Sequence, residues 1–504
     1  MTRGAVTLAP QPIAQYMCRT MRWTTVAVLT ILALACGSDG TGPPPGGNAP
    51  PTNLRFVAQP SLVVANEVIV PAVQVELRDS TGTRVLSATN TVTIALGANP
   101  GGATLSGTTI VNAVAGVARF VDLALDASGT GYTFVASAGT LTSATSAPLR
   151  VAAPLTAVRV SAGGDHTCAI ASGGVTYCWG RNLSGQVGDS TMASPRVSPV
   201  PVHSSLTFET LAAGYDNTCG IIAGGTAYCW GGNLGGRLGD STDTIRVTPT
   251  PVHGGIAFVT VKSAFFHTCG LAISGAAYCW GYANVGQLGD SNLTPHTAMT
   301  PAPVAGGITF TSVSTMNFHA CGVTVAGAAE CWGDNQSGEI GDSTVQYAAS
   351  PTPVMGGLTF ATISAGFGHS CGVTPSGVAY CWGHNAYGQL GDGTYETRKT
   401  PVVVGPNFSA IFAGGTHTCG LTPAGLLYCW GLNQEGQLGD GTFIGHSTPV
   451  PVAGGLHFSD VSVGFGHTCG VTTTGLVYCW GMNGNGQLGN GTQSSSNVPI
   501  RVMR

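Results

Sequence analysis

Cysteine is the residue whose spacing in this chain most directly suggests chemistry. Of the 16 cysteines, 14 form pairs ten residues apart, with a turn near the middle of each intervening segment. Such a segment folds as a hairpin that sets its cysteines opposite each other, which permits a cross-strand disulfide. We expect disulfides, with reduced buried thiols as the alternative. Zinc is disfavoured because one hairpin brings only two thiols and zinc takes four ligands. The pairs are Cys168–Cys178, Cys219–Cys229, Cys269–Cys279, Cys321–Cys331, Cys371–Cys381, Cys419–Cys429 and Cys469–Cys479.

Histidine stands two residues before the first cysteine in six of these seven units, and Asn217 replaces it in the other. Zinc would require imidazoles that converge on one point, whereas equivalent positions in separate repeats lie apart. An asparagine at one of these positions favours a hydrogen-bonding role. We therefore expect structural histidines, and neither a metal nor any other cofactor. The histidines are His166, His267, His319, His369, His417 and His467.

The residue after each Trp-Gly varies in chemistry from unit to unit. Four of these residues, Arg181, Tyr282, Asp334 and His384, are candidate ligand-binding residues. Three of them fall in successive units, so a general acid or base set is conceivable. An exposed turn position that tolerates any residue is the plainer alternative. The long turns after each Gly-Asp, such as 191–196 and 394–399, form a second candidate set because surface loops often carry binding.

Four short strands can be counted in each unit, and the units recur about every 50 residues from residue 155 to the end. Units of this size cannot bury both faces alone, so they form a radial array whose last unit closes on the first. The sequence thus predicts a seven-bladed β-propeller over 155–504. Trp and Tyr alternate with the second cysteine, and we expect each Trp to pack between blades rather than to form a sugar-binding platform.

The motifs HTC, YCWG, an Asn two residues later, GQLGD and PxPV resemble the repeats of the regulator of chromosome condensation family. This resemblance implies a seven-bladed propeller. It does not imply nucleotide exchange, which belongs to one nuclear member, whereas other members are secreted binders, including a bacterial inhibitor of β-lactamases. The predicted propeller carries 10 basic and 16 acidic residues, which argues against a nucleic-acid partner.

The whole chain has an all-β composition, with 76 glycines and only 8% charged residues. Residues 52–153 show strand alternation at Val73, Val75 and Leu77 before a predicted hairpin turn at 79–82. Further strands are expected at 91–96, 116–125, 131–139 and 147–153, as in a small β-sandwich. The segments VQVELRDSTG, ATLSGTT, GVARFVDLAL and GYTFVASAG resemble bacterial immunoglobulin-like domains of the invasin and intimin type. Such a domain acts as a stalk, or less often in adhesion.

An export signal is predicted at the amino end. The apolar run 26–35 follows Arg19 and Arg22 and is too short to span a bilayer, which is typical of a signal peptide over 1–35. Met21 is a plausible alternative start. The run ends at Cys36, followed by a Gly/Pro-rich tether over 36–51, and this pattern resembles a bacterial lipoprotein signal with Cys36 as the lipidated residue. Ordinary cleavage that leaves a free Cys36 is the alternative.

Taken together, these features favour a non-enzymatic, lipid-anchored binding protein of the bacterial cell envelope or surface. We expect a monomer that binds an extracellular protein or glycan through variable loops on a rigid scaffold. A propeller enzyme, such as a polysaccharide lyase or glycosidase, is the alternative, although the non-repeating acids are scattered over several blades. A purely structural envelope protein also fits the sequence.

Overall fold

A computed structural model of the chain describes residues 49–504. The predicted signal peptide, Cys36 and most of the predicted tether lie outside the described residues. Within 49–504 the regular structure is β, apart from one short 3-10 turn, η2 (Leu234–Gly236). This confirms the prediction of an all-β fold that was made from the composition.

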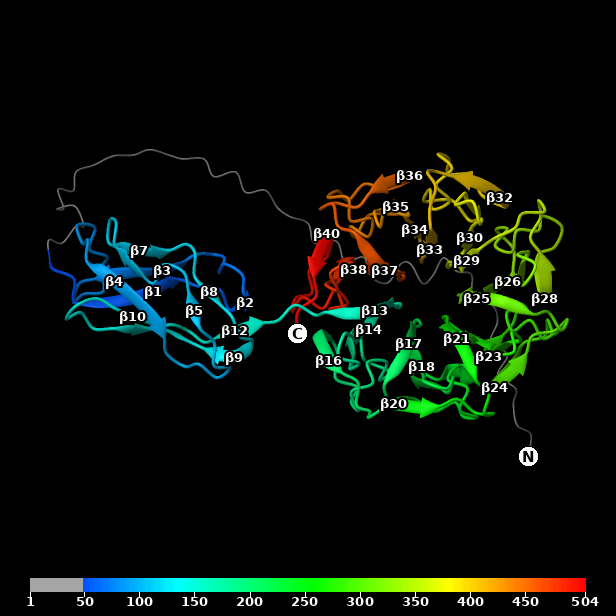
Figure 1. The fold of residues 1–504 in the computed structure, drawn as a ribbon, viewed down its shortest axis with the longest axis horizontal. Coiled ribbons are helices and arrows are strands. Elements are labelled where there is room, and N and C mark those ends of the chain that lie inside the picture. Colours follow the sequence, from blue (N-terminus) through cyan, green and yellow to red (C-terminus); the bar gives the residue numbers. More distant parts are fainter. Residues whose placement is uncertain (1–48) are drawn as a thin grey trace, which may run out of the picture. The chain divides into compact units, whose positions relative to one another are not determined.

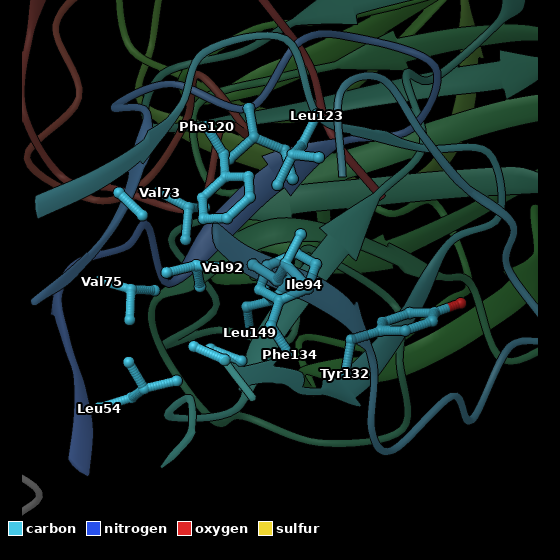
Figure 2. Close-up of a cluster of buried hydrophobic side chains, with 14 of the residues drawn as sticks. Leu54, Val73, Val75, Val92, Ile94, Phe120, Leu123, Tyr132, Phe134 and Leu149 are labelled. Carbon is cyan, nitrogen blue, oxygen red and sulfur yellow. The ribbon is translucent and has the colours of Figure 1, made fainter. Parts of the chain in front are cut away.

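The N-terminal β domain contains twelve strands in three main sheets and one short pair. Their inward side chains form one core, which includes Leu54, Val73, Phe120 and Phe134 (Figure 2). The sheets have the orders β1-β3-β7, β11-β10-β4-β6, β2-β12-β9 and β5-β8. The strands are β1 (Asn53–Ala58), β2 (Leu62–Val64), β3 (Val73–Arg78), β4 (Thr91–Leu96), β5 (Leu105–Ser106), β6 (Ile110–Asn112), β7 (Val117–Phe120), β8 (Ala124–Leu125), β9 (Gly129–Tyr132), β10 (Phe134–Ser137), β11 (Ala144–Thr145) and β12 (Leu149–Ala152).

Three expectations for this domain need correction. The stretch 116–125, expected as one strand, is divided between β7 and β8, which belong to different sheets. The stretch 131–139, expected as one strand, is divided at Thr133 between β9 and β10, which belong to different sheets. The turn at 79–82 forms, because the Asp79 carboxylate accepts the amides of Thr81 and Thr83. It does not open a regular hairpin, since only the bridge Arg78–Arg84 follows it and β3 pairs with β1 and β7 instead.

Residues 157–501 form seven four-stranded antiparallel sheets, numbered here in chain order. Figure 1 shows them as a ring, with the first strand of each sheet nearest the centre and the fourth outermost. Sheet 1 comprises β13 (Ala157–Ala162), β14 (His166–Ala171), β15 (Thr176–Gly180) and β16 (Arg196–Pro201); sheet 2, β17 (Phe208–Ala213), β18 (Asn217–Ile222), β19 (Ala227–Gly231) and β20 (Arg246–Pro251); sheet 3, β21 (Phe258–Ser263), β22 (His267–Ala272), β23 (Ala277–Ala283) and β24 (His296–Pro303); sheet 4, β25 (Phe310–Met316), β26 (His319–Thr324), β27 (Ala329–Asp334) and β28 (Tyr347–Pro353); sheet 5, β29 (Thr362–Ala365), β30 (His369–Val373), β31 (Ala379–Gly383) and β32 (Arg398–Val404); sheet 6, β33 (Ala410–Ala413), β34 (His417–Leu421), β35 (Leu427–Gly431) and β36 (His446–Pro451); sheet 7, β37 (Phe458–Val463), β38 (His467–Thr472), β39 (Val477–Gly481) and β40 (Ser496–Arg501).

Sheet 7 closes directly on sheet 1. The amide of Val160 donates to Asp460 Oδ2 at 2.8 Å, and the amide of Ala162 donates to Ser462 Oγ at 2.9 Å. The chain that enters the ring is also bonded to the chain that leaves it, since Leu155 N donates to Val502 O. The last sheet is therefore held by hydrogen bonds at its inner strand and at its terminus.

Each predicted cysteine pair forms a disulfide between the second and third strands of one sheet, and the two cysteines are direct partners in register, as in Cys168 and Cys178. The disulfide of one sheet packs against the tryptophan of the next: Cys168 and Cys178 share a buried cluster with Phe208 and Trp230. All seven tryptophans of this pattern are fully buried. The expectation that they form the core between sheets is confirmed.

The recurring histidines also join neighbouring sheets. His166 Nε2 lies 2.8 Å from Thr218 Oγ1, whose hydroxyl donates to the carbonyl of Gln186 at 2.8 Å. Because that hydroxyl hydrogen is already used, the imidazole must donate its Nε2–H, and Nδ1 carries the lone pair. Asn217, in the same position of sheet 2, donates to Ser263 Oγ at 2.7 Å. These contacts support the structural role expected for this position.

Candidate binding face

The strand order places two sets of loops at one end of the ring. In an antiparallel sheet, the connection from the first strand to the second and the connection from the third to the fourth lie at the same end. Hydrogen bonds join the two sets: the amide of Tyr282 donates to Phe266 O at 3.0 Å, and the amide of Asp334 donates to Phe318 O at 3.0 Å. We call this end of the ring the binding face.

The four candidate residues lie at equivalent points of the binding face, but in four different sheets. Arg181 is in sheet 1, where it contacts Asp165 at 3.6 Å. In sheets 3, 4 and 5, Tyr282 is the penultimate residue of β23, Asp334 is the last residue of β27, and His384 directly follows β31. All four are half-buried. The geometry brings three of them into consecutive sheets and leaves Arg181 apart.

The binding face also carries aromatic residues that the sequence analysis missed. They occupy the loops between first and second strands, one or two residues before the recurring His or Asn217. Tyr215 and Phe265 have ring centroids 4.0 Å apart, and Phe266 stacks on Phe318 at 4.7 Å. Phe465 contacts both Tyr215, at 6.3 Å, and Phe367, at 5.4 Å. We call Tyr215, Phe265, Phe266, Phe318, Phe367 and Phe465 the mouth aromatics.

Among these rings lies a small cavity of about 30 Å³, lined by Tyr215, Phe265, Asn317, Phe367 and Phe465 among others. A space of this size holds a water molecule or two rather than a substrate. The mouth aromatics are half-buried, so parts of their rings remain accessible. The arrangement is therefore a contact surface and not a deep catalytic cleft.

Ionisable side chains surround the aromatics. Arg237 is 3% exposed and donates from Nη1 to Asp216 Oδ1 at 2.7 Å. Burial raises the pKa of Asp334, and burial together with the Asp334 charge raises the pKa of Glu339 to about 7. Burial lowers the pKa of His384, whose Nδ1 accepts from Gln389 Nε2 at 2.8 Å. The Glu339 carboxyl is thus kept partly neutral near pH 7.

Arg237 and Glu339 were not predicted as site residues, because they lie inside the GQLGD block, which was used only as a repeat motif. The same position holds Gln186, Gln287, Gln389, Gln437 and Gln487 in the other sheets. A charged residue that replaces glutamine in a repeated and buried block was the available signal.

The long turns after Gly-Asp, the second candidate set, are fixed by their own contacts. Asp189 Oδ1 accepts the amide of Thr191 at 3.1 Å, and Asp189 Oδ2 accepts from Arg196 Nε at 2.7 Å. Asp240 with Arg246 and Asp392 with Arg398 repeat this ion pair. These aspartates therefore cap the turns, and the arginines of the turns are engaged with them.

Residues 49–504 contain no group of three or more His, Cys, Asp or Glu arranged to hold a metal ion. Nor does this part of the chain include a helix long and apolar enough to cross a bilayer.

Comparison with known proteins identifies the repeats. Residues 157–186, 360–389, 408–437 and 458–487 match one family model described as the Regulator of chromosome condensation (RCC1) repeat, and residues 376–421, 424–471 and 474–504 match a second of the same description. The chain therefore carries RCC1 repeats.

Two curated relatives match short segments. The chain is 34% identical over 97 residues to a bifunctional serine/threonine-protein kinase/NEDD4-like E3 ubiquitin-protein ligase of Dictyostelium discoideum, which covers 18% of this chain and 5% of that protein. It is 33% identical over 92 residues to the ultraviolet-B receptor UVR8 of Arabidopsis thaliana, covering 17% of this chain and 20% of the receptor. The match thus spans a fifth or less of each relative.

Solved structures show the same fold. Prp20p from Saccharomyces cerevisiae matches with a TM-score of 0.59 and 20% identity, covering 69% of this chain and 87% of that one. Human WBSCR16 matches with a TM-score of 0.58 and 20% identity, covering 65% and 93%. The ring is therefore an RCC1-like propeller of four-stranded sheets.

Proposed function

We propose that the protein is an exported, lipid-anchored binding protein, in which the seven sheets act as the blades of a seven-bladed β-propeller. In this proposal the N-terminal β domain is an immunoglobulin-like stalk that carries the propeller away from the envelope. The partner is an extracellular protein or glycan rather than nucleic acid, and the protein is a monomer. No catalytic role is proposed.

The observation that carries this proposal is the binding face. Positions filled alike in every repeat serve packing, whereas the binding face concentrates half-exposed aromatic rings and ionisable residues that differ between sheets. Aromatic and arginine side chains dominate many binding interfaces because they supply large rigid contact areas and several donors. The small cavity supports binding at a surface rather than turnover of a substrate.

The partner can be identified by crosslinking in cells that export the protein, followed by mass spectrometry of what is captured. An extracellular protein or glycan captured on peptides of the binding face would support the proposal. Crosslinks confined to the N-terminal β domain would contradict it and assign binding to the stalk.

The lipid anchor is tested by the substitution Cys36→Ser. Acyl chains contribute about 0.8 kcal/mol for each buried methylene, so removing them should release the protein from membranes. Fractionation should find the variant in the soluble fraction and the unsubstituted protein with membranes. A Cys36→Ser variant that still sediments with membranes would contradict lipidation at this residue.

A further inference from the structure

In sheet 2, the cationic side chain of Arg237 is hydrogen-bonded to acceptors of the binding face. The guanidinium of Arg237 donates to Asp216 Oδ1 at 2.7 Å and to the carbonyl of Phe265, in the next sheet, at 2.5 Å. A Cβ at Gly232 would lie 2.5 Å from Asp216 Oδ2, so glycine after Trp-Gly makes room for this carboxylate. The molecule thereby shows which acceptors surround a cation at this place.

Sheet 4 lacks this cation and offers comparable acceptors, although Phe318 replaces Asp216 and the carboxylate comes instead from the position of Gly232. Glu339 occupies the position of Arg237, Asp334 supplies a carboxylate after Trp-Gly, and the carbonyl of Phe367 corresponds to that of Phe265. That carbonyl accepts one hydrogen bond, from Asn317 Nδ2 at 3.0 Å, and has capacity for a second.

Only one of the two carboxylate oxygens of Glu339 accepts a hydrogen bond from the described residues, although the residue is only 5% exposed. Its Oε2 accepts the amide of Ser337 at 2.8 Å, while no donor among the described residues hydrogen-bonds to Oε1. Oε1 faces the space beside Gly368, where a Cβ would lie 3.9 Å from it and 3.4 Å from His384 Cβ. The glycine keeps this space open between sheets 4 and 5.

Two acids in the loops between first and second strands have cationic partners. Asp165 has Arg181 and Asp216 has Arg237, but neither Asp334 nor Glu339 forms a salt bridge within the described residues. A buried carboxylate without a cation is unfavourable, and an added positive charge relieves it. Sheet 4 is therefore the part of the face that is complementary to a positive charge.

We infer that Asp334, Glu339 and the carbonyl of Phe367 receive a cationic side chain, the guanidinium of an arginine or the ammonium of a lysine, presented by a protein partner. This inference rests on the proposed function and specifies the partner's chemistry. Phe318 stands beside the site, since its carbonyl accepts the Asp334 amide, and its ring stacks on Phe266. The mouth aromatics would contact the apolar stem of such a side chain.

The inference is tested with small probes on the full exported protein. N-acetyl-arginine amide and N-acetyl-lysine amide are titrated and followed by NMR, with N-acetyl-citrulline amide as the uncharged control. We expect saturable binding of the two cations and at least tenfold weaker binding of citrulline, about 1.4 kcal/mol or more. Equal binding of citrulline, or no saturable binding of either cation, would overturn the inference.

Matched variants locate the site. Asp334→Asn with Glu339→Gln should weaken cation binding at least tenfold, whereas Glu435→Gln, which removes one acid from the same end of sheet 6, should leave it unchanged. Glu339→Arg should reproduce the Arg237 arrangement, so it should raise the melting temperature and abolish probe binding. Loss of binding in Glu435→Gln, or retained binding in Glu339→Arg, would overturn the inference.

The crosslinked partner separates this inference from the proposed function. If capture survives Asp334→Asn with Glu339→Gln but is lost when Phe265 and Phe318 are changed to alanine, the cation site is wrong and the binding face stands. If capture survives both changes, the proposed function itself is wrong.

Discussion

Six buried histidines make the ring sensitive to acid. Each lies fully or almost fully buried, and burial lowers its pKa from 6.5 to about 3. Each therefore stays neutral in the folded protein while it is protonated in the unfolded chain below pH 6.5. Their contribution to stability is complete above pH 6.5 and is lost as the pH falls toward 3.

The substitution His267→Asn measures this effect. His267 Nε2 lies 2.6 Å from Thr315 Oγ1. Thr315 occupies the position in sheet 4 that Ser263 occupies in sheet 3, where Ser263 Oγ accepts a hydrogen bond from Asn217. Asparagine at position 267 should therefore be accommodated. One histidine accounts for about 1.4 kcal/mol per pH unit in this range. Denaturant unfolding between pH 6 and 4 is the measurement. The free energy of unfolding of the variant should fall with decreasing pH less steeply than that of the parent, by about that amount for each pH unit. Parallel loss of stability in variant and parent would contradict the account.

Glu339 should have the opposite pH dependence. Its folded pKa is raised from 4.5 to about 7, so as the pH rises from 4.5 to 7 the unfolded chain ionises first and the fold is penalised. Glu339→Gln removes this penalty and should stabilise the protein by about 3 kcal/mol at pH 8, with little effect at pH 4. Equilibrium unfolding at the two pH values is the measurement. A variant less stable than the parent at pH 8 would show that the carboxylate has a structural partner.

At the scale of the element, one buried asparagine organises the long turn in six of the seven sheets. Asn385 is fully buried and donates to the carbonyls of Thr394 and Glu396, while its Oδ1 accepts the amide of Leu390. Sheet 3 has Ala283 at this position, and there β23 and β24 extend so that Ala283 pairs with His296. Backbone pairing replaces the amide side chain where the asparagine is missing.

Asn385→Ala should therefore destabilise the protein by about 3 kcal/mol, because several buried groups lose their partner together. Thermal unfolding of the variant is the measurement. A loss below about 0.5 kcal/mol, as for an ordinary surface change, would contradict this role.

At the scale of the whole molecule, the regular spacing of cysteine and tryptophan allowed the ring to be predicted from the sequence. Only part of its binding face could be predicted in this way. Cysteine spacing located the hairpins and Trp alternation located the inter-sheet core, since both reflect packing that every repeat must satisfy. Phe318 and Phe367 were not foreseen because they precede the recurring histidine in a short loop, and only ring closure brings such loops together. In the N-terminal β domain, the break between β9 and β10 was not predicted either. The alternation of apolar residues continues through Thr133, although the two strands bond to different sheets.

The central claim is that a partner binds at one end of the ring. The most direct test is capture of the crosslinked partner by a variant with Arg181, Tyr282, Asp334 and His384 all changed to alanine. The control changes Val175, Ile273 and Val325 to alanine, since these exposed residues lie in the turns at the opposite end. We predict folded proteins in both cases, with capture lost in the first and retained in the control. Undiminished capture by the first variant would contradict the claim.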